Sequence, residues 1–130
     1  MNKKILIIDD QDEVRRFLQR AGETLGYDIK TTDNGREGLE LCLEWKPDAV
    51  LTDIFMPDQD GLETIRALRK SYPEIRILAM SGGGSMGHVD VLRTARAMGA
   101  AGVLTKPFNR GTLAEVLQQL FAPSPEKSDG

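Results

Sequence analysis

The sequence predicts an α/β fold, a doubly wound five-stranded parallel sheet with helices on both faces. Five short apolar runs alternate with longer amphipathic segments, which is the order of five βα units. Their largely apolar character suggests strands buried on both faces of a parallel sheet. Crossovers between parallel strands are right-handed, and this places helices on both sides.

The predicted strands are short and rich in β-branched residues. They are KILII (4–8), YDIKT (27–31), DAVLT (48–52), RILAM (76–80) and GVLT (102–105).

Between the strands, apolar residues recur with the helical period of 3.6. The expected inner faces are Val14, Phe17, Leu18, Ala21 and Leu25; Leu39, Cys42 and Leu43; Leu62, Ile65, Leu68 and Tyr72; Leu92, Ala95 and Met98 within residues 87–98; and Leu113, Val116, Leu117, Leu120 and Phe121. Gly26 and Gly99 suit the ends of the first and fourth helices, while Pro47 and Pro73 stop the second and third.

Size and composition favour one globular domain. The chain has 130 residues and a net charge of −3, from 17 basic and 20 acidic residues, so its overall charge gives no reason to expect nucleic acid as a partner. The single cysteine, Cys42, fits a reducing compartment. Without a signal peptide or an apolar run of about 20 residues, we expect a cytoplasmic protein with no membrane partner.

Charged residues follow three of the predicted strands. Asp9 and Asp10 end the first, Asp53 the third and Lys106 the fifth. In open α/β sheets, ligands bind beyond the carboxyl ends of the strands. If the first and third strands are neighbours, three carboxylates crowd together there and repel one another unless a cation is present. Oxygen ligands of this kind suit Mg²⁺, which keeps waters and leaves room for a phosphate, and Lys106 adds a positive charge.

Four segments give this pattern a specific resemblance. They are IIDDQ (7–11), LTDIFMPDQDG (51–61), MSGG (80–83) and GVLTKPF (102–108). In order and spacing they resemble response-regulator receiver domains, over about residues 3–121. The resemblance implies the flavodoxin-like, chemotaxis-regulator-like (CheY-like) fold with strand order 2-1-3-4-5. It also implies a receiver domain over residues 1–122, and residues 123–130 read as a disordered tail.

The resemblance also implies a role for each matching residue. Asp53 would accept a phosphoryl group from a histidine kinase or histidine phosphotransfer protein. Asp9, Asp10 and Asp53, with the backbone carbonyl of Phe55, would bind Mg²⁺, for which Mn²⁺ could substitute. Ser81 and Lys106 would contact the phosphoryl oxygens, and a cis Lys106–Pro107 peptide is expected. The domain would signal through protein–protein contacts, with neither a DNA-binding output domain nor turnover of a separate substrate.

Three features depart from the family pattern. Val103 stands where many receivers carry a switching Tyr or Phe, so the usual coupling to Ser81 is in question. The stretch SGGGSMG (81–87) carries three consecutive glycines, which lower the cost of loop rearrangement. Phe55 and Gly83 occupy positions that tune acyl-phosphate hydrolysis in the family.

Two other motifs in the sequence are incomplete. Gly82, Gly84 and Gly87 match the dinucleotide-binding glycine pattern, but they follow the fourth strand and lack the acidic residue expected about 20 residues later. The Asp58–Gly61 stretch resembles a calcium loop, yet the first ligand position is Met56 and the closing position is Ala67.

Two other functions are possible for the same residues. A phosphatase or phosphotransferase acting on small molecules would also use an aspartate, Mg²⁺ and a lysine. The haloacid-dehalogenase type needs a second acid two residues after its nucleophile, where this chain has Phe55. The third possibility is a binding module that is never phosphorylated, against which the complete set of strand-end residues argues.

Overall fold

The structure, a computed structural model, describes residues 2–56, 59–82 and 88–122. Its main sheet has five parallel strands, β1 (Lys4–Ile8), β2 (Asp28–Thr32), β3 (Ala49–Asp53), β6 (Arg76–Ser81) and β7 (Gly102–Thr105). Their order is β2-β1-β3-β6-β7. Counted along the chain within this sheet, the order is 2-1-3-4-5, which confirms the predicted fold class.

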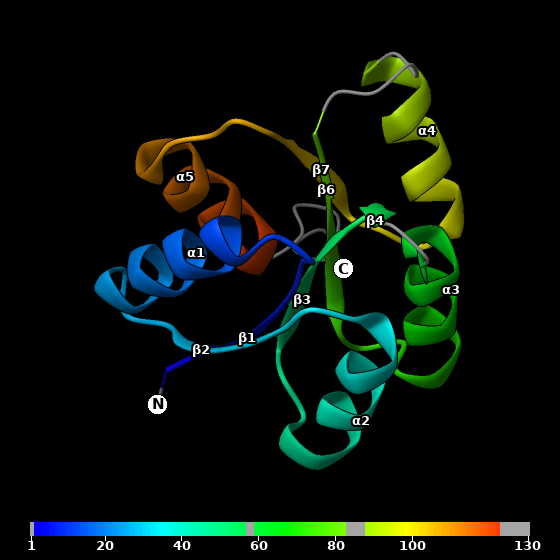
Figure 1. The fold of residues 1–130 in the computed structure, drawn as a ribbon, viewed down its shortest axis with the longest axis horizontal. Coiled ribbons are helices and arrows are strands. Elements are labelled where there is room, and N and C mark those ends of the chain that lie inside the picture. Colours follow the sequence, from blue (N-terminus) through cyan, green and yellow to red (C-terminus); the bar gives the residue numbers. More distant parts are fainter. Residues whose placement is uncertain (1, 57–58, 83–87, 123–130) are drawn as a thin grey trace, which may run out of the picture.

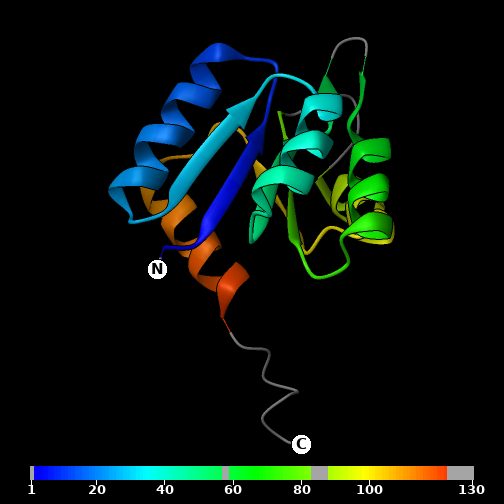
Figure 2. The ribbon, with the colours of Figure 1, turned by 90° about the horizontal axis from the view of Figure 1, so that it is seen from below.

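The helices form two layers, one on each side of the sheet (Figure 1). Helices α1 (Asp12–Thr24) and α5 (Arg110–Phe121) cover one face. Helices α2 (Gly35–Trp45), α3 (Gly61–Ser71) and α4 (His88–Met98) cover the other. Figure 2 shows β1 and β2 running side by side in the same direction.

The core divides into two apolar clusters because strand side chains alternate between faces. From β1, Ile5 and Ile7 pack with α1 and α5, while Leu6 and Ile8 pack with α2 and α3. All four are at most 1% exposed. Burying such a side chain contributes about 1.5–3 kcal/mol, so this alternation fixes the register of the central strands.

The edge strand β2 differs from the expectation. Burial on both faces was predicted for all five runs, but in β2 the residues Asp28 and Lys30 are exposed. The prediction is wrong here because β2 lies at the end of the sheet and pairs only with β1.

A small antiparallel pair was also missed. Strands β4 (Phe55–Met56) and β5 (Gln59–Asp60) form a two-stranded ladder between β3 and α3, where the sequence predicted no strand. Two residues per strand are too few to show a period of two, and so the sequence carried no signal for them.

Helix ends follow local chemistry. Gly26 and Gly99, just beyond α1 and α4, have φ angles of 97° and 118°, in the region that favours glycine. The side chains of Asn34 and Asn109 accept hydrogen bonds from the backbone N–H groups of Glu37 and Thr112, which caps α2 and α5.

One arginine ties three segments together on the α3–α4 side. Arg69 of α3 donates to the carbonyl of Gly99 (2.9 Å) just beyond α4 and to that of Ile75 (3.2 Å) before β6. It also donates to the carbonyl of Pro73, which follows the end of α3. Helix α4 is thereby fixed to α3 at its C-terminal end.

Two expectations fall outside the described residues. The tail 123–130 and most of the glycine-rich stretch, residues 83–87, are among the residues not described. Within the part that is described, none of the helices has the length and apolar character needed to cross a membrane.

Candidate functional site

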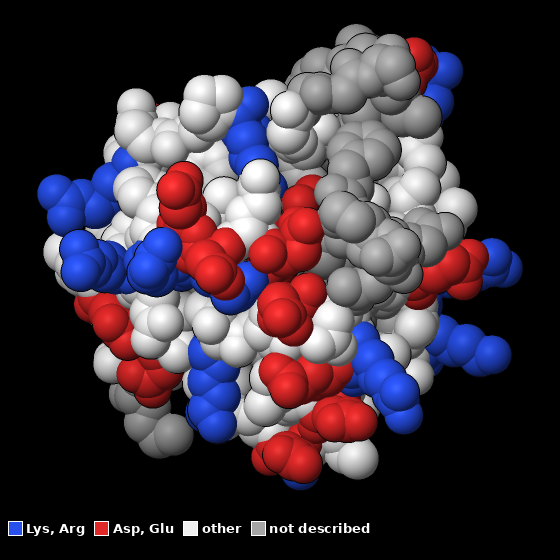
Figure 3. Space-filling view, in the orientation of Figure 1, with Lys and Arg blue, Asp and Glu red and all other residues white. Residues whose placement is uncertain are grey.

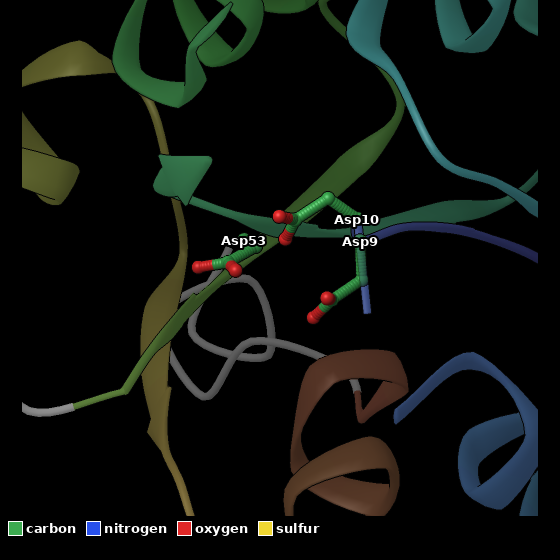
Figure 4. Close-up of side chains that lie close together, drawn as sticks. All are labelled: Asp9, Asp10 and Asp53. Atoms are coloured by element: carbon green, nitrogen blue, oxygen red, sulfur yellow. The ribbon is translucent and has the colours of Figure 1, made fainter. Parts of the chain in front are cut away.

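The sheet order brings the three predicted carboxylates together. Strands β1 and β3 are neighbours with Ile8 opposite Thr52, so Asp9 and Asp53 follow at adjacent positions. Asp10 comes next in the chain. One carboxylate oxygen from each of these three residues lies within 4.8 Å of the others (Figure 4). The spatial cluster predicted from sequence is therefore present.

Lys106 reaches this cluster across the end of the sheet. Its Nζ lies 2.8 Å from Asp9 Oδ2 and 3.2 Å from Asp53 Oδ2. Its backbone N–H donates to the carbonyl of Ser81 at 2.7 Å, which holds the lysine at the end of β7. The peptide between Lys106 and Pro107 is cis, as the resemblance implied.

Burial strengthens these charge interactions. Asp9 is fully buried and Asp53 is 4% exposed, while Asp10 is half-buried. Burial alone would lower the pKa of Lys106. The hydrogen bond from its ammonium to Asp9 and the charge of Asp53 outweigh burial, so the pKa of Lys106 is raised. Lys106 therefore remains a permanent cation at neutral pH.

The charges at this edge do not balance without an added cation. Three carboxylates and one ammonium leave two negative charges. Among the described residues, no ion pair to the Asp10 carboxylate is found. Figure 3 shows acidic side chains gathered in the middle of this face. A divalent ion that prefers oxygen ligands fits both the donor set and the missing charge.

The other predicted site residues lie on β4, β6 and β7. Ser81 is 5% exposed and ends β6, opposite Thr105 of β7. Phe55 begins β4, two residues beyond Asp53, and its backbone pairs with Asp60. Val103 is partly buried on β7 opposite Ala79, within the cluster beneath α2, α3 and α4. Their functional roles stay predictions.

Gly61 is a site-shaping residue that the sequence did not reveal. A Cβ atom at this position would lie 2.4 Å from the carbonyl oxygen of Asp53 and 2.4 Å from Ile54 Cα. Both are backbone atoms, so a side chain here would have to displace the end of β3. The glycine lets α3 begin directly against the strand that carries Asp53.

Gln11 was missed as well. Its backbone N–H donates to Asp9 Oδ1 at 2.9 Å, and its side-chain Oε1 accepts from Lys106 Nζ at 3.3 Å. The only sequence signal is its place directly after the aspartate pair.

Comparison with known proteins decides the family. The family model for the response regulator receiver domain matches residues 5–118. The chain belongs to the response-regulator receiver family. The three-carboxylate cluster described above fits the metal site of a receiver domain.

Individual receiver proteins are similar over most of the chain. The chemotaxis protein CheY of Thermotoga maritima is 33% identical over 121 residues, which cover 92% of this chain and 98% of that protein. Sporulation initiation phosphotransferase F of Bacillus subtilis is 29% identical over 119 residues, covering 92% and 94%. Other relatives are longer, and the chain corresponds to 24% of one and 50% of another.

Solved receiver structures have the same fold. The chemotaxis protein CheY4 of Vibrio cholerae superposes with a TM-score of 0.85 at 30% identity, covering 93% of this chain and all of that one. The receiver family is a signalling family of two-component systems, and no enzyme family is indicated.

Proposed function

We propose that this receiver domain takes a phosphoryl group onto Asp53 from a phosphohistidine of a histidine kinase or histidine phosphotransfer protein. The observation that carries the proposal is the position of Lys106, whose ammonium donates to both Asp9 and Asp53. This arrangement sets a fixed positive charge beside a carboxylate that is 4% exposed. Such a charge is what an incoming phosphoryl group requires.

The transfer is a displacement at phosphorus. A carboxylate oxygen of Asp53 forms the new O–P bond while the P–N bond of the donor breaks. The electron pair of the P–N bond returns to the imidazole nitrogen. The ring leaves as neutral imidazole when its other nitrogen already carries a proton, and otherwise it takes up a proton as it leaves. Lys106 and Ser81 then contact the phosphoryl oxygens. Attack of water on phosphorus later releases inorganic phosphate and restores the Asp53 carboxylate.

The metal in this proposal is Mg²⁺, with Mn²⁺ as a substitute. Asp9, Asp10, Asp53 and the backbone carbonyl of Phe55 would hold it. The ion would neutralise charge on the phosphoryl oxygens during transfer. The residues themselves keep the ligands in place, because Gln11 N–H fixes Asp9 and the close approach of Gly61 fixes the end of β3.

The signalling mode follows from where the charge changes. We assign the receiver domain to residues 1–122, as a cytoplasmic module that acts through protein–protein contacts. A phosphoryl group on Asp53 would add charge and acceptor oxygens at the end of β6, where Met80 lies opposite Asp53 and Ser81 follows it. Helix α4 is the next element in the chain after Ser81, and we propose that it responds to this added charge.

Val103 gives this response a specific character. A valine has no ring to exchange between buried and exposed positions, so we propose that phosphorylation is transmitted here without aromatic switching. In Val103→Tyr, we expect affinity for a downstream partner to change more than the rate of phosphorylation. Equal partner affinity before and after that substitution would contradict a role for position 103.

The decisive experiment is incubation with Mg²⁺ and a small phosphoryl donor such as acetyl phosphate, followed by intact-mass measurement. We expect one added phosphoryl group in the wild type and none in Asp53→Asn or in the presence of a chelator. Labelling that persists in Asp53→Asn would refute the assignment of Asp53.

The same preparation tests the two rival functions. Sustained multiple-turnover hydrolysis of an unrelated phosphoester would favour a phosphatase over a receiver. A wild type that gains no phosphoryl group from either a small donor or a phosphohistidine protein would favour a binding module.

A further inference from the structure

The N-cap of α1 is occupied by a residue that does not cap the helix. Ser, Thr, Asp and Asn are preferred at this position because their short side chains accept from the first backbone N–H groups. Asn34 and Asn109 do so for α2 and α5. The side chain of Gln11 makes no such bond to α1. Helix stability therefore does not explain glutamine at position 11.

The side chain of Gln11 is instead directed to Lys106. Gln11 Oε1 accepts from Lys106 Nζ at 3.3 Å, although 95 positions separate the two residues. The same ammonium donates to Asp9 Oδ2 at 2.8 Å and to Asp53 Oδ2 at 3.2 Å. An ammonium group has three N–H donors, and these three oxygens supply one acceptor for each.

We propose that Gln11 is a positioning residue that orients the Lys106 ammonium toward Asp53. This inference rests on the proposed function and adds a residue to its machinery. The Lys106 side chain has a flexible four-carbon stem. Of the three hydrogen bonds that its ammonium donates, the one to Asp9 is the shortest. Without the third acceptor, the ammonium would turn toward Asp9, and its contact with Asp53 would weaken. Gln11 also donates to Asp9 Oδ1 through its backbone N–H, so it contacts both the lysine and one of the two carboxylates that the lysine binds.

Three substitutions at position 11 separate positioning from folding. Gln11→Met keeps the length of the side chain and removes the acceptor. Gln11→Ser supplies a good helix cap but is too short to reach Lys106. Gln11→Glu keeps an acceptor oxygen at the same reach. Gln19→Met, on the same helix, is the matched control because Gln19 interacts with Glu23 and not with the site.

The first measurement is the side-chain ¹⁵N signal of Lys106 in the metal-free protein, assigned by its loss in Lys106→Met. We expect this signal to shift or broaden in Gln11→Met and Gln11→Ser. It should persist in Gln11→Glu and be unchanged in Gln19→Met.

The second measurement is the rate of Asp53 labelling by acetyl phosphate with Mg²⁺. We expect Gln11→Met and Gln11→Ser to be labelled about three- to tenfold more slowly, the effect of one hydrogen bond to a charged group. Urea unfolding should show Gln11→Ser to be at least as stable as the wild type. Slower labelling of an equally stable protein is a result that a purely structural role would not give.

Two results would overturn the inference. One is an unchanged Lys106 signal together with unchanged labelling in Gln11→Met and Gln11→Ser. The other is slower labelling that only parallels a loss of stability in both variants. If the wild type itself were never labelled on Asp53, the proposed function would fail, and the Lys106 signal in Gln11→Met would still decide whether Gln11 positions the lysine.

Discussion

The ammonium of Lys106 donates to Asp9 Oδ2 at 2.8 Å, joining two residues that lie 97 positions apart in the chain. In the sheet, β1 and β7 are separated by β3 and β6. The lysine therefore spans the ends of two intervening strands. A contact of this kind forms only when the strand order is complete, so it links the site directly to the fold.

Removing this ammonium should destabilise the metal-free protein. In Lys106→Met, the fully buried Asp9 and the nearly buried Asp53 lose their cation. We expect a loss of about 3 kcal/mol in the free energy of unfolding, measured by urea denaturation in EDTA. Adding Mg²⁺ should recover part of this loss. The control is Lys70→Met, an exposed lysine of α3. Equal stability of the two variants in EDTA would show that the ion pairs contribute nothing.

Neutralising Asp10 should have opposite effects on the metal-free and metal-bound protein. Asp10→Asn relieves repulsion within the carboxylate cluster, so we expect the metal-free protein to gain up to about 1 kcal/mol. Binding of Mg²⁺ should become roughly tenfold weaker, because the site loses a charged ligand. Thermal midpoints over a series of Mg²⁺ concentrations measure both effects. The control is Glu40→Gln, an exposed residue of α2, which should change neither quantity. If Mg²⁺ stabilised Asp10→Asn as much as the wild type, Asp10 would not be a metal ligand.

Adding one methyl group at position 61 should disturb the site through the backbone. In Gly61→Ala the new Cβ would overlap with backbone atoms of Asp53 and Ile54, so we expect a loss of about 2–4 kcal/mol in stability. Slower phosphorylation should accompany it, since the end of β3 is displaced. Gly102→Ala is the control, because its Cβ would meet only Leu78 Cδ1 at an ordinary 3.6 Å. Chemical denaturation measures the stability of the two variants, and labelling by acetyl phosphate measures their phosphorylation rates. Similar stability of Gly61→Ala and Gly102→Ala would argue against the close packing of Gly61 on the backbone of Asp53 and Ile54.

The buried thiol should make stability fall at alkaline pH. Cys42 is fully buried on α2, and burial raises the pKa of its thiol to about 11. An unfolded cysteine loses its proton near pH 8.5, roughly its unperturbed pKa. Between these values the unfolded state binds fewer protons, so stability decreases as pH rises, by no more than about 3 kcal/mol.

Comparison with Cys42→Ala isolates this effect from the other groups that titrate in the same range. The difference in unfolding free energy between the wild type and Cys42→Ala should be constant below pH 8 and shrink steadily above it. A difference that stays constant up to pH 11 would mean that the thiol ionises equally in both states.

The sequence predicted the central strands well because their chemistry is repetitive. Four or five consecutive apolar residues, as in Ile5–Ile8, indicate a buried strand without any tertiary information. The strand-end aspartates could be placed together because parallel strands share an edge. For the same reason, the neighbouring positions of β1 and β3 were sufficient to predict the carboxylate cluster.

The features that the sequence did not reveal depend on how closely separate segments of the chain pack together. Whether Gly61 has space for a side chain depends on how α3 meets the end of β3, which no local pattern encodes. The contact between Gln11 and Lys106 requires the strand order and the rotamers of both residues. The short strands β4 and β5 and the exposed face of β2 likewise follow from position in the sheet.

The anchoring of α4 by Arg69 has a mechanical consequence. The guanidinium holds the carbonyl of Gly99 just beyond the C-terminal end of this helix, while the opposite end follows the segment that leaves Ser81. A helix of 11 residues fixed at one end acts as a lever about 16 Å long. Any push from the Ser81 side would swing α4 about its fixed end, so the largest excursion would occur at the N-terminal end of the helix and the smallest beside Arg69.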